Sequence, residues 1–504
     1  MIIAESTVID DHYLKVGESM QSRFSLCVSL CAVLCLCVND SFASLTNNTL
    51  SKNKTTTSES NNITEIVSHH KTPQYWQISR AAYKDKLHGF WLGQSIANWT
   101  GLITEMDKVG SPATMPFYTD NDWGSTDLPA VWGQGVPHSD TIDFFFVHNQ
   151  QAWGADDDTD IEYMYQYLHE AHQTSLLTAK QIQQGWLTHT YSEEDAPLNK
   201  KFPSDKAVKE NFLWESNQRV RILMAEGMLP PNTSEPKNNN KYMMIDAQLT
   251  TEIFGLLAPL RPDIALQMAE LPVRASAKYD AYWISQFYIV MHALASQQQL
   301  SRSLKEQVII MAEQASAVLP EGSTPALMYD FVKQSYLANP DKDNWEKTRD
   351  QVYQRYQINS NDGYVYKDPF EAGINFAASL VSLFYGEGDI VRTIQIGTLA
   401  GWDSDNPAAT WGGLLGFMIG KDGIAKAFNQ STLSEDYWIH RTRRNFPDHT
   451  PNQVGEDTFS MMSQRAIKVI DQVVVEQMHG KIDFEKNIWL IPSVNIDVVT
   501  NVDQ

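Results

Sequence analysis

The chain has 504 residues, of which 42% are hydrophobic, and its formal net charge is −22 at pH 7. This hydrophobic share is sufficient for a sizeable core, and the length allows one large domain or several average ones. The acidic balance argues against nucleic acid as a partner, because a nucleic-acid groove needs a basic patch and the sequence has no run of lysines and arginines that forms one. Most of the negative charge is explained by a solvated acidic surface.

Residues 1–43 predict an export signal. Residues 20–23 end in Arg23 and give a short positive start, and residues 24–38 form an apolar run too short to cross a bilayer. Residues 41–43 supply small side chains for cleavage after Ala43, and a true start at Met20 would explain the polar residues before it. We therefore expect an exported protein, periplasmic or secreted, that has no membrane association apart from this signal.

The cysteines all lie inside the apolar run, at Cys27, Cys31, Cys35 and Cys37. A chain cleaved after residue 43 therefore has no disulfide, no thiolate nucleophile and no Cys-ligated zinc. Residues 34–37 match a lipoprotein box only loosely, because small residues are missing before Cys37. Lipid anchoring is thus the weaker alternative to cleavage.

Composition divides the remaining chain into a linker and one domain. Residues 44–73 are rich in Asn, Thr, Ser and Lys and predict a disordered polar linker. Residues 80–97 predict a helix, whereas residues 106–155 interleave Gly, Pro and Trp without a period and predict a long loop. Helical patterns then follow at 160–172, 178–190, 207–227, 244–257, 262–270, 281–298, 302–318, 324–338, 343–357, 370–385, 388–400, 407–419 and 458–479. We predict an all-α fold, with a single compact, mostly helical domain at 74–480, long irregular loops, and an irregular tail at 481–504.

Two acidic clusters each precede an apolar helix. Residues 156–160 read Asp-Asp-Asp-Thr-Asp, and residues 403–406 read Asp-Ser-Asp-Asn. A packed pair of these helices would bring carboxylate-rich ends together, which hard cations such as Mg²⁺ or Mn²⁺ would neutralise. The alternative is helix capping with solvated charge, since one Asp at a helix start is a common N-cap worth about 1 kcal/mol. Spacing alone leaves both interpretations open.

These residues resemble the motifs of the ADP-ribosylglycohydrolase family. Residues 157–159 are similar to the end of its Thr-Asp-Asp-Thr motif, and residues 401–406 with the Gly-rich stretch after them are similar to its Gly-Gly-Asp-Thr-Asp-Thr motif. Residues 85–94 resemble the opening helix of the family, Glu105 stands where the family has a Glu, and residues 245–262 resemble its central helices. The resemblance covers about residues 80 to 425 and implies the family's helical fold.

The resemblance also implies a centre for two Mg²⁺ ions, with Mn²⁺ as the alternative. The residues that would hold them are Asp156, Asp157, Asp158, Asp403, Asp405 and Asn406. Asp156 and Asn406 each replace a Thr of the family pattern, and both still offer an oxygen to Mg²⁺. Gln94 departs from the family where an Asp is common.

The implied reaction is hydrolysis of a glycosidic bond to a ribosyl-type sugar, with a small-molecule sugar or ADP-ribosyl substrate as the partner. Glu105 and Asp158 are the catalytic candidates. Trp402, Trp123 and Trp132 are candidates for substrate contact, because they lie beside the acidic motif or in the aromatic loop. Two alternatives remain: an exported glycoside hydrolase that acts on an oligosaccharide or furanoside with the same fold, and a non-catalytic binding member of the family.

Overall fold

A computed structural model describes residues 74–110, 114–131, 139–154, 156–192, 213–297, 301–439, 443–451 and 455–493. The expected export signal at 1–43, the expected linker at 44–73 and the candidate Trp132 lie outside the described residues. Within the described part of the chain, no helix is both long and apolar enough to cross a membrane.

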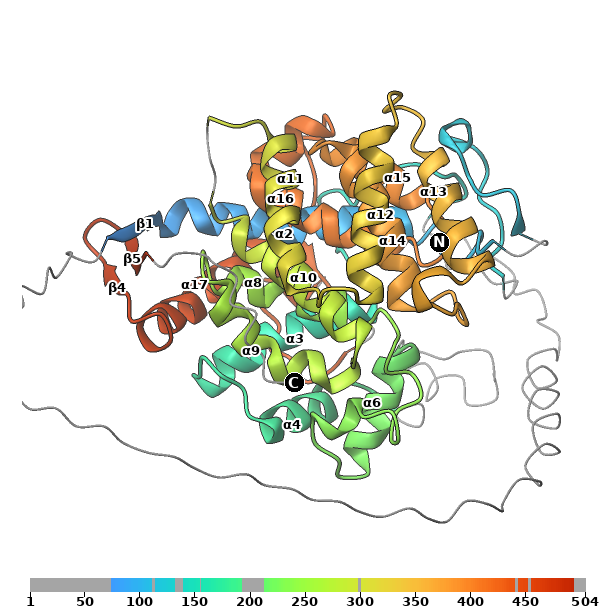
Figure 1. Ribbon diagram of the computed structural model, residues 1–504. Helices are drawn as coiled ribbons and strands as arrows, with labels where there is room; N and C mark the ends of the chain where they lie inside the picture. Colours follow the sequence, from blue (N-terminus) through green and yellow to red (C-terminus); the bar gives the residue numbers. More distant parts are fainter. Residues whose placement is uncertain are drawn as a thin grey trace, which may run out of the picture. The chain divides into compact units, whose positions relative to one another are not determined.

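The described residues form a predominantly helical unit, which confirms the predicted fold class (Figure 1). Its helices are α2 (Arg80–Gly101), α3 (Asp157–His172), α4 (Ala179–His189), α6 (Glu215–Ala225), α7 (Ala247–Thr251), α8 (Ile253–Leu257), α9 (Pro262–Ser276), α10 (Asp280–Leu294), α11 (Leu304–Ala315), α12 (Thr324–Ala338), α13 (Glu346–Val352), α14 (Ala372–Gly386), α15 (Ile390–Leu399), α16 (Asp405–Ala427) and α17 (Phe459–Glu476).

Helices α2 and α16 pack against each other along their whole length, in opposite directions. Glycines allow this close approach. A Cβ added at Gly93 would lie 2.3 Å from the carbonyl oxygen of Gly412, and one added at Gly416 would lie 2.3 Å from the carbonyl oxygen of Gly89. Because the two backbones touch, the C-terminal end of α2 is fixed beside the N-terminal end of α16.

The remaining helices surround this pair. Helices α14 and α15 pack on α16, whereas α10 contacts α7, α8 and α9, and α3 contacts both α7 and α17. Every residue of α14 is buried, which its apolar sequence explains. The expected buried faces of the two motif helices are also present, since Ile161, Met164, Tyr165 and Leu168 on α3 and Trp411, Leu414, Leu415 and Met418 on α16 are all buried.

The strands are few and short. Strand β1 (Tyr75–Ser79) pairs antiparallel with β5 (Ile488–Pro492), which pairs antiparallel with β4 (Lys481–Asp483), and β2 (Asp436–Tyr437) pairs with β3 (Asp457–Thr458). Part of the expected irregular tail is therefore ordered as strand. The tail prediction from residue 481 is wrong for 481–492, because Trp489 and Ile491 alternate into the core while β1 supplies the hydrogen-bond partners.

Candidate metal centre

Two helix N-termini meet at a cluster of carboxylates. Helix α3 begins at Asp157, directly after its N-cap residue Asp156, and α16 begins at Asp405. The Nδ2 group of Asn98, on α2, donates to Asp156 Oδ2 at 2.7 Å and to Asp405 Oδ2 at 3.1 Å. The starts of α3 and α16, almost 250 residues apart in the chain, are thereby joined through α2. The residues expected to bind metal therefore lie close together.

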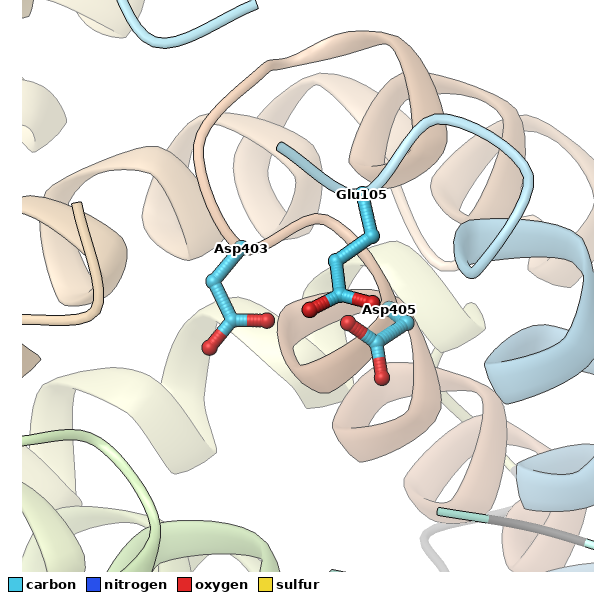
Figure 2. Close-up of side chains that lie close together, drawn as sticks. All are labelled: Glu105, Asp403 and Asp405. Atoms are coloured by element: carbon cyan, nitrogen blue, oxygen red, sulfur yellow. The ribbon is translucent and has the colours of Figure 1, made fainter. Parts of the chain in front are cut away.

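The first acidic group consists of Glu105, Asp403 and Asp405, whose carboxylate oxygens lie within 4.8 Å of one another. Figure 2 shows Glu105 reaching from the segment after α2 toward the two aspartates at the start of α16. Backbone hydrogen bonds hold the segment in place: Met106 N donates to Trp402 O at 3.0 Å, and Trp402 N donates to Lys108 O at 2.7 Å. Asp403 and Asp405 are buried, whereas Glu105 is partly exposed to solvent.

The second acidic group consists of Asp157, Asp158 and Asp246, and its oxygens also lie within 4.8 Å of one another. Asp246 directly precedes α7, and its Oδ1 accepts the backbone N–H of Asn217 at 2.9 Å. The Nδ2 group of Asn217 donates to Asp157 Oδ2 at 2.8 Å and to Asp158 Oδ1 at 2.7 Å. The first turn of α6 thus supplies donors to all three acids, as the positive end of a helix does.

Asparagine amides link the two acidic groups. Asn406, next to Asp405 on α16, donates its Nδ2 to Asp158 Oδ2 at 2.8 Å. Among the described residues, the buried Oδ1 atoms of Asn98, Asn217 and Asn406 accept no hydrogen bond, and neither does Asp405 Oδ1. Buried acceptors are normally satisfied, so oxygens left in this state around clustered acids indicate that a cation belongs among them.

The electrostatics of the centre point in the same direction. Burial, with the neighbouring carboxylates, raises the pKa of Glu105, Asp157, Asp158 and Asp405 well above the ordinary range. Burial likewise raises the pKa of Asp403 and of Asp246 to about 7. The nearby Arg443 guanidinium opposes the shift at Asp157 without reversing it. So many acids cannot all be ionised at neutral pH unless positive charge enters the centre.

The available ligand atoms determine which cations fit the two acidic groups. Both offer carboxylate oxygens, with amide oxygens beside them, and neither contains a His or a Cys. Hard cations prefer such oxygen ligands, so the residues present are suited to a metal ion of that class.

Helix capping explains one of the predicted ligands. Asp156 Oδ1 accepts the backbone N–H of Thr159 at 2.9 Å, which makes Asp156 an ordinary N-cap of α3. Its Oδ2 accepts from Asn98. Both oxygens of Asp156 thus accept hydrogen bonds, and its role as a metal ligand stays a prediction. The two groups of three acids contain Glu105 and Asp246 instead.

The structure corrects the expectation that Trp402 contacts the substrate. Trp402 has no exposed surface, its ring packs on Phe117 at a centroid distance of 4.7 Å, and its Nε1 donates to Gln357 Oε1 at 2.8 Å. Its φ of +57° belongs to the left-handed region that favours glycine. The residue thus shapes the turn before Asp403 from inside the core.

Trp123 packs in an aromatic cluster. Its ring meets Phe144 at a centroid distance of 4.8 Å, and Phe144 in turn contacts Phe146 and Phe428. Trp123 is only partly exposed, and its packing there is structural.

Three residues around the centre were missed as site residues by the sequence reasoning: Asp246, Asn217 and Asn98. Asp246 stands in the Ile-Asp-Ala-Gln stretch at 245–248, whose resemblance to the central helices of the family was its only signal. Asn98 lies on α2 five residues after Gly93, and no local pattern marks Asn98 or Asn217 as a site residue.

Comparison with known proteins gives three results. The sequence model of the ADP-ribosylglycohydrolase family matches residues 79–454. A search of curated proteins finds no match. Among solved structures, one described as an "ADP-ribosylglycohydrolase-related protein complex" is similar, with 12% identity, a TM-score of 0.44, and coverage of 78% of this chain and 99% of that one.

Proposed function

Because the chain belongs to the ADP-ribosylglycohydrolase family, a family of hydrolases, we propose that it hydrolyses a glycosidic bond to a ribosyl-type sugar in a metal-dependent reaction. One observation carries the proposal: two groups of three carboxylates lie side by side, with orphaned buried oxygens around them. A non-catalytic member would gain nothing from such clustered like charge, which costs stability.

Two Mg²⁺ ions, with Mn²⁺ as the alternative, are the proposed cofactors, one for each acidic group. Such ions supply Lewis acidity that orients the vicinal hydroxyls of a sugar and lowers the pKa of a nearby water. Asp403 and Asp405 would hold one ion, with the Glu105 carboxylate beside it, and Asp157, Asp158 and Asp246 would hold the other. Asn406, beside Asp405, connects the two sets through its hydrogen bond to Asp158.

Glu105 is the proposed general base. It is the one acid of the two groups that is partly exposed, so it can reach a water in the open part of the centre. Glu105 accepts the proton of that water while the water oxygen bonds to the anomeric carbon and the bond to the leaving group breaks. The leaving group takes its proton from solvent.

Asp158 is proposed to bind and orient and not to transfer a proton. Both of its oxygens accept hydrogen bonds, Oδ1 from Asn217 and Oδ2 from Asn406. A carboxylate held at both oxygens orients a ligand well, whereas it is poorly placed to move a proton. Asp158 therefore binds and orients.

The first substrate class proposed is an ADP-ribosyl conjugate, as the family implies. The second is a neutral oligosaccharide or furanoside, and one observation favours it: on the α6 side, Lys241 is already paired with the carboxylates of Glu215 and Asp368, so this cation is not available to a pyrophosphate. Export through residues 1–43 also forms part of the proposal and fits this second class, because sugar polymers are abundant outside cells.

The test compares an ADP-ribosylated peptide with ribo- and arabinofuranosides and oligosaccharides. We expect hydrolysis of one class, its loss in excess chelator, and its return with Mg²⁺ or Mn²⁺. Turnover that persists in chelator on any of the substrates contradicts the metal-dependent mechanism. The Glu105→Gln protein should retain metal binding while kcat falls by about 10²-fold or more, as expected for a lost general base.

A further inference from the structure

Trp214 lies at the edge of the acidic centre and faces outward. It is the N-cap residue of α6, and its backbone N–H donates to Asp157 Oδ2 at 3.0 Å. Its side chain is 47% exposed. Because the Trp214 backbone contacts an acid of the centre, its half-exposed indole is a candidate to contact a ligand that extends beyond the acids. Sugar and base rings stack on large aromatic faces of this kind.

The backbone beside Trp214 is held in an unusual conformation. Glu215 has a φ of +38°, in the region that residues other than glycine rarely adopt. Such conformations persist where neighbouring contacts impose them, and they cluster at functional sites. Here the contacts are those of the first turn of α6 with the second acidic group, through Trp214 N and the Asn217 amides. The position of Trp214 is therefore set by the acidic centre itself.

The charged side chains of the segments beside Trp214 are paired with one another. Lys241 Nζ forms an ion pair with Glu215 and lies 3.4 Å from Asp368 Oδ2, so one cation serves two carboxylates. We call Trp214, Glu215, Lys241 and Asp368 the α6 rim. Its formal charge is −1. A pyrophosphate needs cationic donors that are not already paired, whereas a neutral ring needs only an apolar face and nearby hydrogen-bonding groups.

We propose that Trp214 is the platform on which a neutral sugar ring stacks, next to the ribosyl-type unit held at the acidic centre. The inference rests on the proposed function and narrows it to a glycoside with at least two neutral sugar units. Glu215, Lys241 and Asp368 present carboxylate and ammonium groups to the hydroxyls of the second ring. Trp214 takes over the role that the sequence assigned to the buried Trp402.

The test compares a one-ring substrate, methyl ribofuranoside, with a neutral ribosyl disaccharide in the metal-loaded full chain. Trp214→Ala should raise KM for the disaccharide about tenfold more than for the one-ring compound, the size expected for one lost stacking contact. Trp214→Phe keeps a stacking face and should recover most of the difference. Trp76→Ala is the matched control, since Trp76 is a 37% exposed tryptophan on β1, and it should leave both substrates unchanged.

If Trp214→Ala changed KM equally for the two substrates and left the melting temperature unchanged, the proposal that Trp214 is a stacking platform would be wrong. Tighter binding of an ADP-ribosylated peptide than of the disaccharide would overturn the neutral ligand class.

Failure of the proposed function gives a different result. If the wild-type protein hydrolyses neither sugar, calorimetry of the disaccharide on the wild-type and Trp214→Ala proteins still tests the platform. Weaker binding by the variant supports it, and equal or absent binding rejects it.

Discussion

At the scale of single residues, the centre depends on acids whose charge is tolerated only when cations accompany them. Asp246 and Asp403 allow the two acidic groups to be tested separately, because each belongs to a different group. Asp246→Asn should remove one of two bound metal ions and leave the other, and Asp403→Asn should do the same for the other group. Titration calorimetry with Mn²⁺ measures both stoichiometries.

The control is Asp330→Asn, an exposed acid on α12 that should leave two ions bound. Unchanged stoichiometry in both Asp246→Asn and Asp403→Asn would contradict the assignment of one ion to each group. A second readout is the metal-free stability, which should stay level or rise in both variants because one of several crowded like charges is removed.

At the scale of elements, the glycine contact between α2 and α16 sets the distance between the acids they carry. Gly93→Ala places a Cβ 2.3 Å from the Gly412 carbonyl oxygen, so the two helices must separate. We expect a loss of about 1–3 kcal/mol in the free energy of unfolding, as for overpacking in a rigid core. Metal affinity should fall too, since Asn98 and Asp405 move apart. Denaturant unfolding and calorimetry measure the two effects.

Gly397→Ala provides a graded control for this contact. An added Cβ there would meet nothing closer than 3.3 Å, at Ala408, so a small adjustment accommodates it. If Gly397→Ala lowered the free energy of unfolding as much as Gly93→Ala does, close helix spacing would not be the reason for glycine at these positions.

At the scale of the whole molecule, the buried acids make the stability of the metal-free protein depend on pH. Burial raises the folded pKa of Asp403 and of Asp246 to about 7, from the ordinary value of 3.8. A raised folded pKa means that stability is fully present below about pH 4 and is lost as pH rises through about 7. In chelator, the melting temperature should therefore be lower at pH 8 than at pH 5 through these groups.

Added Mg²⁺ should reverse the loss at pH 8 and have less effect at pH 5, because protonated acids bind cations poorly. The measurement is thermal unfolding at both pH values with chelator or with Mg²⁺. If Mg²⁺ raised the melting temperature equally at pH 5 and pH 8, the acidic centre would not be the site at which Mg²⁺ stabilises the protein.

The proposed export concerns the whole molecule, and intact-mass analysis tests it. Protein recovered from the periplasm or medium should begin at Ser44, because residues 41–43 supply the cleavage site. Recovered protein that retains the four cysteines of the apolar run without lipid would contradict the prediction.

The family, the helical fold class and four aspartates of the centre can be inferred from the amino-acid sequence alone. This is possible because helical periodicity is a local property, and because Asp157–Asp158 and Asp403–Asp405 lie in short motifs beside those helices. The periodicity also identified the buried faces of α3 and α16, which the structure confirms.

The packing of distant segments selects the residues that complete the centre and the tryptophan that faces outward. Asp246 and Asn217 reach it from separate elements, and Trp402 and Trp214 differ in exposure although both stand next to acidic residues in the chain. The exposure of a tryptophan and the meeting of side chains at one centre both depend on how the helices pack. The contact of α2 with α16 is an example. Such contacts join segments far apart in sequence, so no local pattern of residues encodes them.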